Sequence, residues 1–283
     1  MELTNSNDIR ILLQRHGFHF SRALGQNFLI SSWVPQQIAE SSLADTGTGV
    51  LEIGPGIGCL TEQLSLRAGK VIALEVDRRL QPILKETLSS CQNVKLLYTD
   101  AMKTDLRRLV AEEFTGLRKV ACANLPYQIT SPILLKLLDV KELDVITVMI
   151  QREVAQRICA SPGSADYGAL SLRVQWEMET DFLFSVPPSC FIPQPGVTSS
   201  VIRLIRRKNL PVSVRDEAAM FRLIRAAFGQ RRKTLVNAVS SQLPGLDREK
   251  LEMALRSCGL DTRVRGESLS VAQFAKLSDE LFI

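Results

Sequence analysis

A short stretch near the middle of the chain combines residues that can hold a planar base. Asn124 is followed by Leu125, Pro126 and Tyr127, directly after the apolar run that begins at Val120. The Asn124 amide oxygen and a nearby backbone carbonyl can accept hydrogen bonds from an exocyclic amino group, and the Tyr127 ring offers a face for stacking. The same residues would also suit a proline turn beside a buried tyrosine. Other parts of the chain have to decide between these two interpretations.

A glycine-rich loop lies between an earlier apolar run and a helix-like segment. Its glycines are Gly54, Gly56 and Gly58. Glycines at such a place let a ligand approach the backbone amides and the amino end of the helix. The spacing departs from the dinucleotide-binding pattern, because Cys59 occupies the sixth position, where glycine or alanine is expected. Glu52, two residues before the loop, carries a carboxylate that would repel a diphosphate.

Acidic residues follow the next two apolar runs. Glu75 ends one run, and Asp100 lies two residues beyond the other. The first carboxylate is placed to hold ribose hydroxyls, and the second can accept a hydrogen bond from an adenine amino group. Since parallel strands end at one edge of a sheet, these acids should lie near Glu52, the glycine loop and Asn124. The set predicts a site for a neutral or cationic adenosine-type ligand.

Apolar runs alternate with segments of helical periodicity through most of the chain. Short apolar runs bounded by breakers are typical of buried parallel strands, and the segments between them suit crossover helices. The pattern predicts an α/β fold with a doubly wound sheet. The expected strands are 49–53, 70–75, 94–98, 120–124, 143–150, 182–186 and 197–205, and the expected helices are 7–16, 32–43, 59–67, 105–114, 130–139, 152–159 and one that ends near 176.

The C-terminal part of the chain is helical in pattern and basic. Strand signals stop near Arg206, so we expect one domain at residues 1–208 and a small all-α domain at residues 209–283. From Arg203 to Ile283 there are 16 basic and 9 acidic residues, whereas the net charge of the whole chain is only +5. Such an excess indicates a polyanionic partner such as nucleic acid, although solvated helix faces can produce a similar surplus. The residues expected to contact nucleic-acid phosphates are Arg222, Arg225, Arg231, Arg232 and Lys233.

The remaining composition indicates the compartment and excludes some classes of site. Six cysteines occur without a C-x-x-C pair, which is the pattern of a reducing compartment without a metal site. No apolar stretch approaches the roughly 18 residues of a membrane span. His16 and His19 lack acidic or cysteine partners at ligand spacing, so we expect ordinary surface roles for both. We therefore expect a cytoplasmic protein without a metal, and a monomer because no long heptad pattern is visible.

Together these motifs resemble those of the ribosomal RNA adenine dimethyltransferases, in particular the bacterial small-subunit enzymes. The resemblance covers the chain from about residue 24 to the C-terminus. It implies the Rossmann-like sheet of class I S-adenosylmethionine-dependent methyltransferases, followed by a small helical domain. The motifs that carry it are Leu24–Leu29, Leu51–Gly58, Asn124–Tyr127, Phe191–Pro195 with Val197 and Ser199, and Ala227–Thr234.

The resemblance also implies a reaction and its participants. Two adjacent adenosines in the 3′-terminal hairpin of 16S ribosomal RNA would each receive two methyl groups on N6, in the immature small ribosomal subunit, with a role in subunit biogenesis. The base would be held by Asn124, Tyr127 and Phe191. S-adenosylmethionine would be held by Asn27, Leu29, Gly54, Gly56, Glu75, Asp100 and Asn124.

Three other functions remain open. The nearest is a related enzyme that modifies one adenosine of large-subunit RNA, although the long helical end and its basic run 230–233 favour the small-subunit interpretation. A second is a ribosome assembly factor without catalysis, which the Asn124–Tyr127 motif disfavours as the sole role. The third is a nicotinamide-dependent oxidoreductase, which Cys59 at the sixth loop position disfavours.

Overall fold

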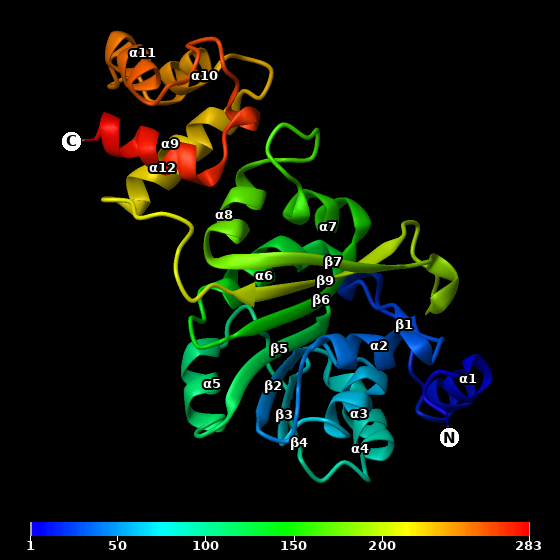
Figure 1. Ribbon diagram of the computed structural model, residues 1–283. Helices are drawn as coiled ribbons and strands as arrows, with labels where there is room; N and C mark the ends of the chain where they lie inside the picture. Colours follow the sequence, from blue (N-terminus) through cyan, green and yellow to red (C-terminus); the bar gives the residue numbers. More distant parts are fainter. Residues whose placement is uncertain (1, 283) are drawn as a thin grey trace. The chain divides into compact units, whose positions relative to one another are not determined.

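The computed structural model describes residues 2–282, which form two compact units (Figure 1). We expected residues 156–180 to belong to the first domain, but in the structure they group with the C-terminal helices. The reason is that Tyr167, Leu172 and Trp176 are buried in the same apolar cluster as those helices. Unit 1 comprises Met1–Ala155 and Asp181–Arg206, and unit 2 comprises Gln156–Thr180 and Arg207–Ile283.

The central sheet has seven strands in the order β4-β3-β2-β5-β6-β9-β7. Strands β4, β3, β2, β5 and β6 run parallel to one another, and β9 runs antiparallel to β6. All residues of β2 are buried, as expected for a strand that has helices on both faces. The predicted doubly wound α/β sheet is confirmed. The bounds are β2 (Thr48–Ile53), β3 (Lys70–Leu74), β4 (Val94–Leu97), β5 (Arg118–Asn124), β6 (Val145–Gln151), β7 (Met178–Val186) and β9 (Ser199–Arg206).

Helices cover the sheet of unit 1. Residues of α2, α3 and α4 pack in one apolar cluster with β2 and β3, on one side of the sheet in Figure 1. The end of α5 packs so closely on β2 that a Cβ at Gly49 would lie 2.3 Å from the Phe114 ring. Helix α4 was not expected, since its short sequence contains Pro82 and few apolar residues. The bounds are α1 (Ser6–Arg15), α2 (Trp33–Ser41), α3 (Cys59–Ser65), α4 (Gln81–Thr87), α5 (Leu106–Glu113), α6 (Thr130–Leu138) and α7 (Arg152–Cys159).

Short elements connect distant parts of unit 1. Strand β1 (Phe28–Leu29) pairs antiparallel with β8 (Phe191–Ile192), which joins the N-terminal segment to the loop before β9. The sequence did not predict this pairing, because two-residue strands leave no periodicity to detect. Among residues 2–282, the 3-10 helices of unit 1 are η1 (Arg22–Leu24), η2 (Arg78–Leu80), η3 (Tyr127–Ile129) and η4 (Pro188–Cys190), and unit 2 contains η5 (Gly266–Ser268).

Unit 2 is built from helices around an apolar core that includes Phe274 and Leu223. Three of its helices begin at N-cap residues. The side chains of Asp216, Thr234 and Ser270 each accept a hydrogen bond from a backbone N–H of the first turn. The predicted helical character of the C-terminal region is confirmed. Among residues 2–282, no helix is long and apolar enough to cross a membrane. The bounds are α8 (Ala169–Glu177), α9 (Glu217–Gly229), α10 (Leu235–Gln242), α11 (Arg248–Ser257) and α12 (Val271–Leu281).

Candidate active site

A cavity in unit 1 lies at the carboxyl ends of β2, β3 and β5 and beside the loop after β4. Strand register places these ends together, because Ile53 pairs with Leu74 and Glu52 pairs with Cys122. Open α/β sheets bind ligands at this edge. The predicted site residues that line the cavity are Asn27, Leu29, Gly54, Gly56, Glu75, Asp100, Asn124 and Tyr127.

The glycine loop owes its course to backbone conformations that other residues rarely adopt. Gly54, Gly56 and Gly58 have φ angles of +72°, +60° and +95°. A Cβ at Gly54 would meet no atom within 4 Å, so it would enter the open space beside the cavity that this residue lines. A Cβ at Gly56 would lie 3.3 Å from the Phe28 ring. The loop therefore needs glycine for its conformation, and at Gly54 it leaves the backbone open to the cavity.

Two buried carboxylates face this cavity. Glu52 is 1% exposed, and its Oε2 has no hydrogen-bond partner among the residues that the structure describes. Burial raises the pKa of Glu52 to about 8 and that of Glu75 to about 7. Glu75 differs in having a partner, since its Oε1 accepts a hydrogen bond from the Asp77 backbone N–H at 2.8 Å. A buried carboxyl group with an unpaired oxygen favours a ligand that brings a hydrogen-bond donor, and a positive charge beside it would favour its ionised form.

The motif predicted to bind the base, Asn124–Tyr127, is fixed to the end of β5. The Leu125 N–H donates to the Met149 carbonyl on the neighbouring strand at 3.1 Å, and the Thr130 hydroxyl donates to the Pro126 carbonyl, also at 3.1 Å. Asn124 is half-buried, and within residues 2–282 its side-chain amide makes no hydrogen bond. The amide is therefore available to a ligand in the cavity.

The Tyr127 ring is held at its far end. Its hydroxyl lies 2.6 Å from the Ser199 hydroxyl at the start of β9. Burial raises the pKa of Tyr127, so the phenol stays protonated and neutral. The half-buried ring lines the cavity together with Asn124. The structure thus brings the predicted amide and aromatic face into one wall.

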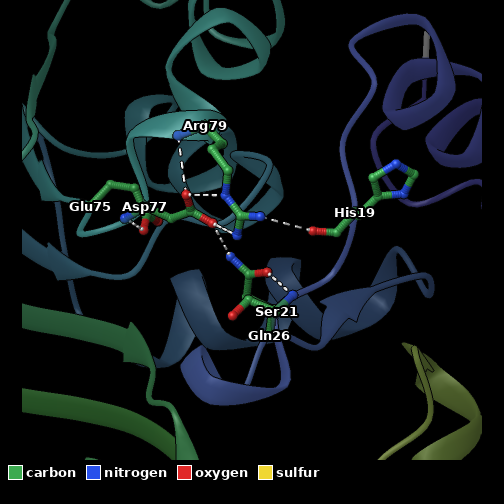
Figure 2. Close-up of polar contacts among 6 residues, drawn as sticks. All are labelled: His19, Ser21, Gln26, Glu75, Asp77 and Arg79. Atoms are coloured by element: carbon green, nitrogen blue, oxygen red, sulfur yellow. Dashed lines mark hydrogen bonds and ion pairs between the residues drawn. The ribbon is translucent and has the colours of Figure 1, made fainter.

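A polar network joins the N-terminal segment to the loop after β3 (Figure 2). Asp77 accepts hydrogen bonds from the Arg79 guanidinium at 2.6 and 2.8 Å and from the Gln26 amide at 2.7 Å. Gln26 in turn accepts from the Ser21 N–H at 2.8 Å. The Arg79 guanidinium beside Asp77 lowers the pKa of that carboxyl. Sequence reasoning missed Asp77 and Arg79, because 51 residues separate Gln26 from Asp77 and no local pattern links them.

Phe191 does not reach the cavity in this structure. The sequence expected its ring as a second stacking face opposite Tyr127. Instead, Phe191 is 1% exposed and packs in the apolar core of unit 1, where β8 pairs it with Leu29. Its register partner Leu29 is a member of the same apolar cluster. A role in stacking stays a prediction that would require the ring to leave the core.

The five predicted RNA contacts all belong to unit 2. They are exposed, on α9 and in the turn before α10. Two of them have protein partners: Arg231 donates to the Ala165 and Tyr167 carbonyls, and Arg222 lies 3.9 Å from Asp216. Arg231 therefore also holds the 161–168 loop of its own unit. The structure describes no cluster of three or more histidine, cysteine, aspartate or glutamate side chains that could hold a metal ion.

The seven-stranded sheet with antiparallel β9, and the cavity at its carboxyl edge, define a class I methyltransferase. A family model described as "Ribosomal RNA adenine dimethylase" matches residues 17–282, and the chain belongs to this family. This confirms the resemblance found in the sequence motifs.

Relatives and solved structures agree with that family. Proteins named "Ribosomal RNA small subunit methyltransferase A" include one from Geobacillus sp. (strain WCH70), 47% identical over 96% of this chain and 95% of the relative. Another, from Bacillus mycoides (strain KBAB4), is 43% identical over 100% of this chain and 98% of its own length. A dimethyladenosine transferase from Plasmodium falciparum superimposes with a TM-score of 0.75 at 27% identity, covering 88% of this chain and 95% of that one. The 23S rRNA methyltransferase ErmE gives 0.68 at 26% identity, covering 90% and 99%.

Proposed function

We propose that this chain uses S-adenosylmethionine to dimethylate N6 of two adjacent adenosines in the 3′-terminal hairpin of 16S ribosomal RNA. The observation that carries the proposal is a single cavity lined by the glycine loop, Glu75 and Asp100 together with Asn124 and Tyr127. The relatives named small subunit methyltransferase A, at 43–47% identity, support the choice of RNA. We propose further that the protein acts as a cytoplasmic monomer on the immature small subunit, with a role in its biogenesis.

The cavity suits a cationic adenosine derivative on three counts. The wall at Gly54 has open space where a side chain would stand, so a ligand can reach the backbone there. The unpaired oxygen of Glu52 can accept a hydrogen bond from a donor, and a positive charge nearby would favour the ionised form of this acid. Asp100 and Glu75 supply acceptors for an adenine amino group and for ribose hydroxyls. The residues proposed to hold S-adenosylmethionine are Asn27, Leu29, Gly54, Gly56, Glu75, Asp100 and Asn124.

The chain's part in catalysis is to prepare and orient the target nitrogen. Adenine N6 is a weak nucleophile because its lone pair is delocalised into the ring. The Asn124 Oδ1 and the Leu125 carbonyl each accept a hydrogen bond from one of the two N6–H groups. These hydrogen bonds favour a pyramidal nitrogen with a localised lone pair. S-adenosylmethionine supplies an electrophilic methyl group: the N6–C bond forms as the S–C bond breaks, S-adenosylhomocysteine is left, and the extra N6 proton passes to water. Alignment of this kind accounts for much of the rate in such reactions.

The target adenine has to leave its stack to enter the cavity, at a cost of a few kcal/mol. Stacking on the Tyr127 ring, worth about 1–3 kcal/mol, offsets much of that cost. The exposed basic residues of unit 2 are proposed to bind RNA phosphates. Base recognition and phosphate binding are thus assigned to different units.

The test is methyl transfer to undermethylated ribosomal subunits. The purified protein is incubated with radiolabelled S-adenosylmethionine and either small or large subunits, and the modified bases are mapped. We expect dimethylated N6 at two adjacent adenosines of small-subunit RNA. Label in large-subunit RNA would favour the single-adenosine enzyme instead. Tight binding to small subunits without label would favour an assembly factor.

A further inference from the structure

We infer that Ser199 is a positioning residue for the base-binding ring, and that its hydrogen bond to Tyr127 matters most in the second methyl transfer to each adenosine. This inference rests on the proposed function and deepens it, because it assigns a separate control over how far the reaction proceeds. Ser199 is not a cavity-lining residue, so it would act only through Tyr127.

The contact between the two side chains is short and sheltered. The hydroxyl oxygens of Tyr127 and Ser199 lie 2.6 Å apart, and Ser199 is 0% exposed. The other end of the tyrosine is held by the backbone of η3, where the Ile129 N–H donates to the Pro126 carbonyl at 3.2 Å. A ring fixed at both ends keeps one orientation in the cavity wall. Without the serine hydroxyl, rotation of the tyrosine side chain would be opposed only by packing.

Strand β6 lies beside both partners of this hydrogen bond. Strand β6 holds the base-binding motif through the Met149 carbonyl, which accepts from the Leu125 N–H. Two residues further along β6, Gln151 is the register partner of Ser199. The distance between the motif and the serine is therefore set by one rigid element.

The chemistry of the substrate makes the second transfer depend more on the ring. An unmodified adenine offers two N6 hydrogens, one for the Asn124 Oδ1 and one for the Leu125 carbonyl. After the first transfer only one hydrogen remains, so the polar part of the clamp loses one of its two hydrogen bonds. Stacking on Tyr127 is unchanged by methylation and then contributes a larger share of the positioning. A loosely held ring would accordingly allow the first transfer and impair the second.

The experiment compares Ser199→Ala, Tyr127→Phe and the double variant with the wild type. Each protein methylates undermethylated small subunits under single-turnover conditions, and the monomethyl and dimethyl adenosines are quantified over time. Loss of one hydrogen bond corresponds to about fivefold in rate, so we expect Ser199→Ala to slow the second transfer about fivefold while the first changes less than twofold, and Tyr127→Phe to slow the second transfer by a similar factor. The double variant should be no slower than either single one.

Ser200→Ala is the matched control. Ser200 is the adjacent buried serine, but its hydroxyl lies 3.3 Å from that of Ser185, on the opposite face of β9. Its ratio of dimethyl to monomethyl adenosine should equal that of the wild type. Ser199→Thr keeps the hydroxyl and should restore part of the second transfer.

The possible failures are distinguishable. If the wild type transfers no methyl group, the proposed function is wrong. If it does, but Ser199→Ala slows both transfers equally or leaves the product ratio unchanged, the inference about Ser199 is overturned. Should Ser199→Ala not fold, Tyr127→Phe alone tests the inference. It removes the same hydrogen bond by changing the half-buried tyrosine instead of the buried serine.

Discussion

At the scale of single residues, two polar groups of the site have no hydrogen-bond partner in the described chain. Glu52 is buried with one oxygen unpaired, and the Asn124 amide makes no hydrogen bond within the described chain. Such groups reduce the stability of the folded protein unless a ligand satisfies them. Both groups line the same cavity, which is the arrangement expected of a binding site.

Replacing the amide tests the role assigned to Asn124. Asn124→Ala removes the acceptor that localises the N6 lone pair, and a misplaced nucleophile costs roughly 100-fold or more in rate. We expect methylation of small subunits to fall by at least that factor, while binding of S-adenosylmethionine, measured by calorimetry, weakens by less than about tenfold. A variant that retains near-normal turnover would rule out this role.

The buried Glu52 should make stability depend on pH. Its pKa is raised to about 8 from an ordinary value of 4.5, so between these values the folded state keeps a proton that the unfolded chain has lost. Stability therefore falls as pH rises through this window. Glu52→Gln removes this linkage, and the drop in melting temperature between about pH 5 and about pH 8 should shrink by several degrees.

The control for this measurement is Glu153→Gln, which changes an exposed carboxylate on α7. Its melting curve should follow that of the wild type at both pH values. Glu75 contributes a linkage of the same sign, since its pKa is raised to about 7, so the dependence should shrink without vanishing. Equal pH dependence in Glu52→Gln and the wild type would contradict the raised pKa of this group.

At the scale of elements, a segment from the N-terminal part of the chain forms part of the cavity wall. Residues 24–29 line it, and the network of Gln26, Asp77 and Arg79 attaches this segment to the loop after β3 (Figure 2). The Arg79 guanidinium also lies 5.3 Å from the centre of the Phe18 ring. The attachment consists of polar contacts at the edge of the unit, and such contacts break more easily than those within a packed sheet.

Loosening this attachment should speed the loss of the cofactor. Arg79 does not line the cavity, so Arg79→Ala disrupts the network without removing a ligand contact. We expect the dissociation rate of S-adenosylmethionine, measured by stopped-flow fluorescence, to rise about threefold, as for the loss of a partly exposed charged pair. The neighbouring exposed Arg78→Ala is the control and should leave the rate unchanged. Equal rates in the two variants would show that the network does not retain the cofactor.

At the scale of the whole molecule, the charge is divided between the units. Unit 2 carries the exposed basic residues of α9 and of the turn before α10, whereas the cavity of unit 1 is lined by carboxylates. Arg225, Arg232 and Lys233 have no ion pair among residues 2–282, so their charges are available to phosphate. This division suits an enzyme that holds a polyanion with one unit and a cationic cofactor with the other.

Salt dependence of RNA binding tests the role of these three cations. Each phosphate contact contributes about 0.7–0.9 to the slope of log affinity against log salt concentration. Replacing all three residues by alanine should lower the slope by about two to three when binding to small subunits is measured by filter retention. Lys250→Ala, another exposed cation of unit 2, should leave the slope nearly unchanged. A triple variant with the wild-type slope would exclude these contacts.

Much of the fold follows from local sequence signals. The apolar runs predicted the strands from β2 to β6, and the helical end was evident from its periodicity. Helix α4 and the β1–β8 pairing escaped prediction, because short elements draw their stability from tertiary contacts rather than from pattern. We did not predict that residues 156–180 belong to unit 2, for a similar reason. Trp176 packs with residues far along the chain, and local sequence does not show this.

The residue types at the site were determined by the sequence itself. Glycines, acids and Asn124 stand at the ends of successive apolar runs, and parallel strands bring such ends to one edge whatever the details of packing. Tertiary structure alone decided which neighbours these residues have. It attached Tyr127 to Ser199, tied Gln26 to Asp77 and placed Phe191 in the core. Those contacts join residues tens of positions apart, and their geometry depends on how strands and loops pack, for which a linear sequence has no local signal.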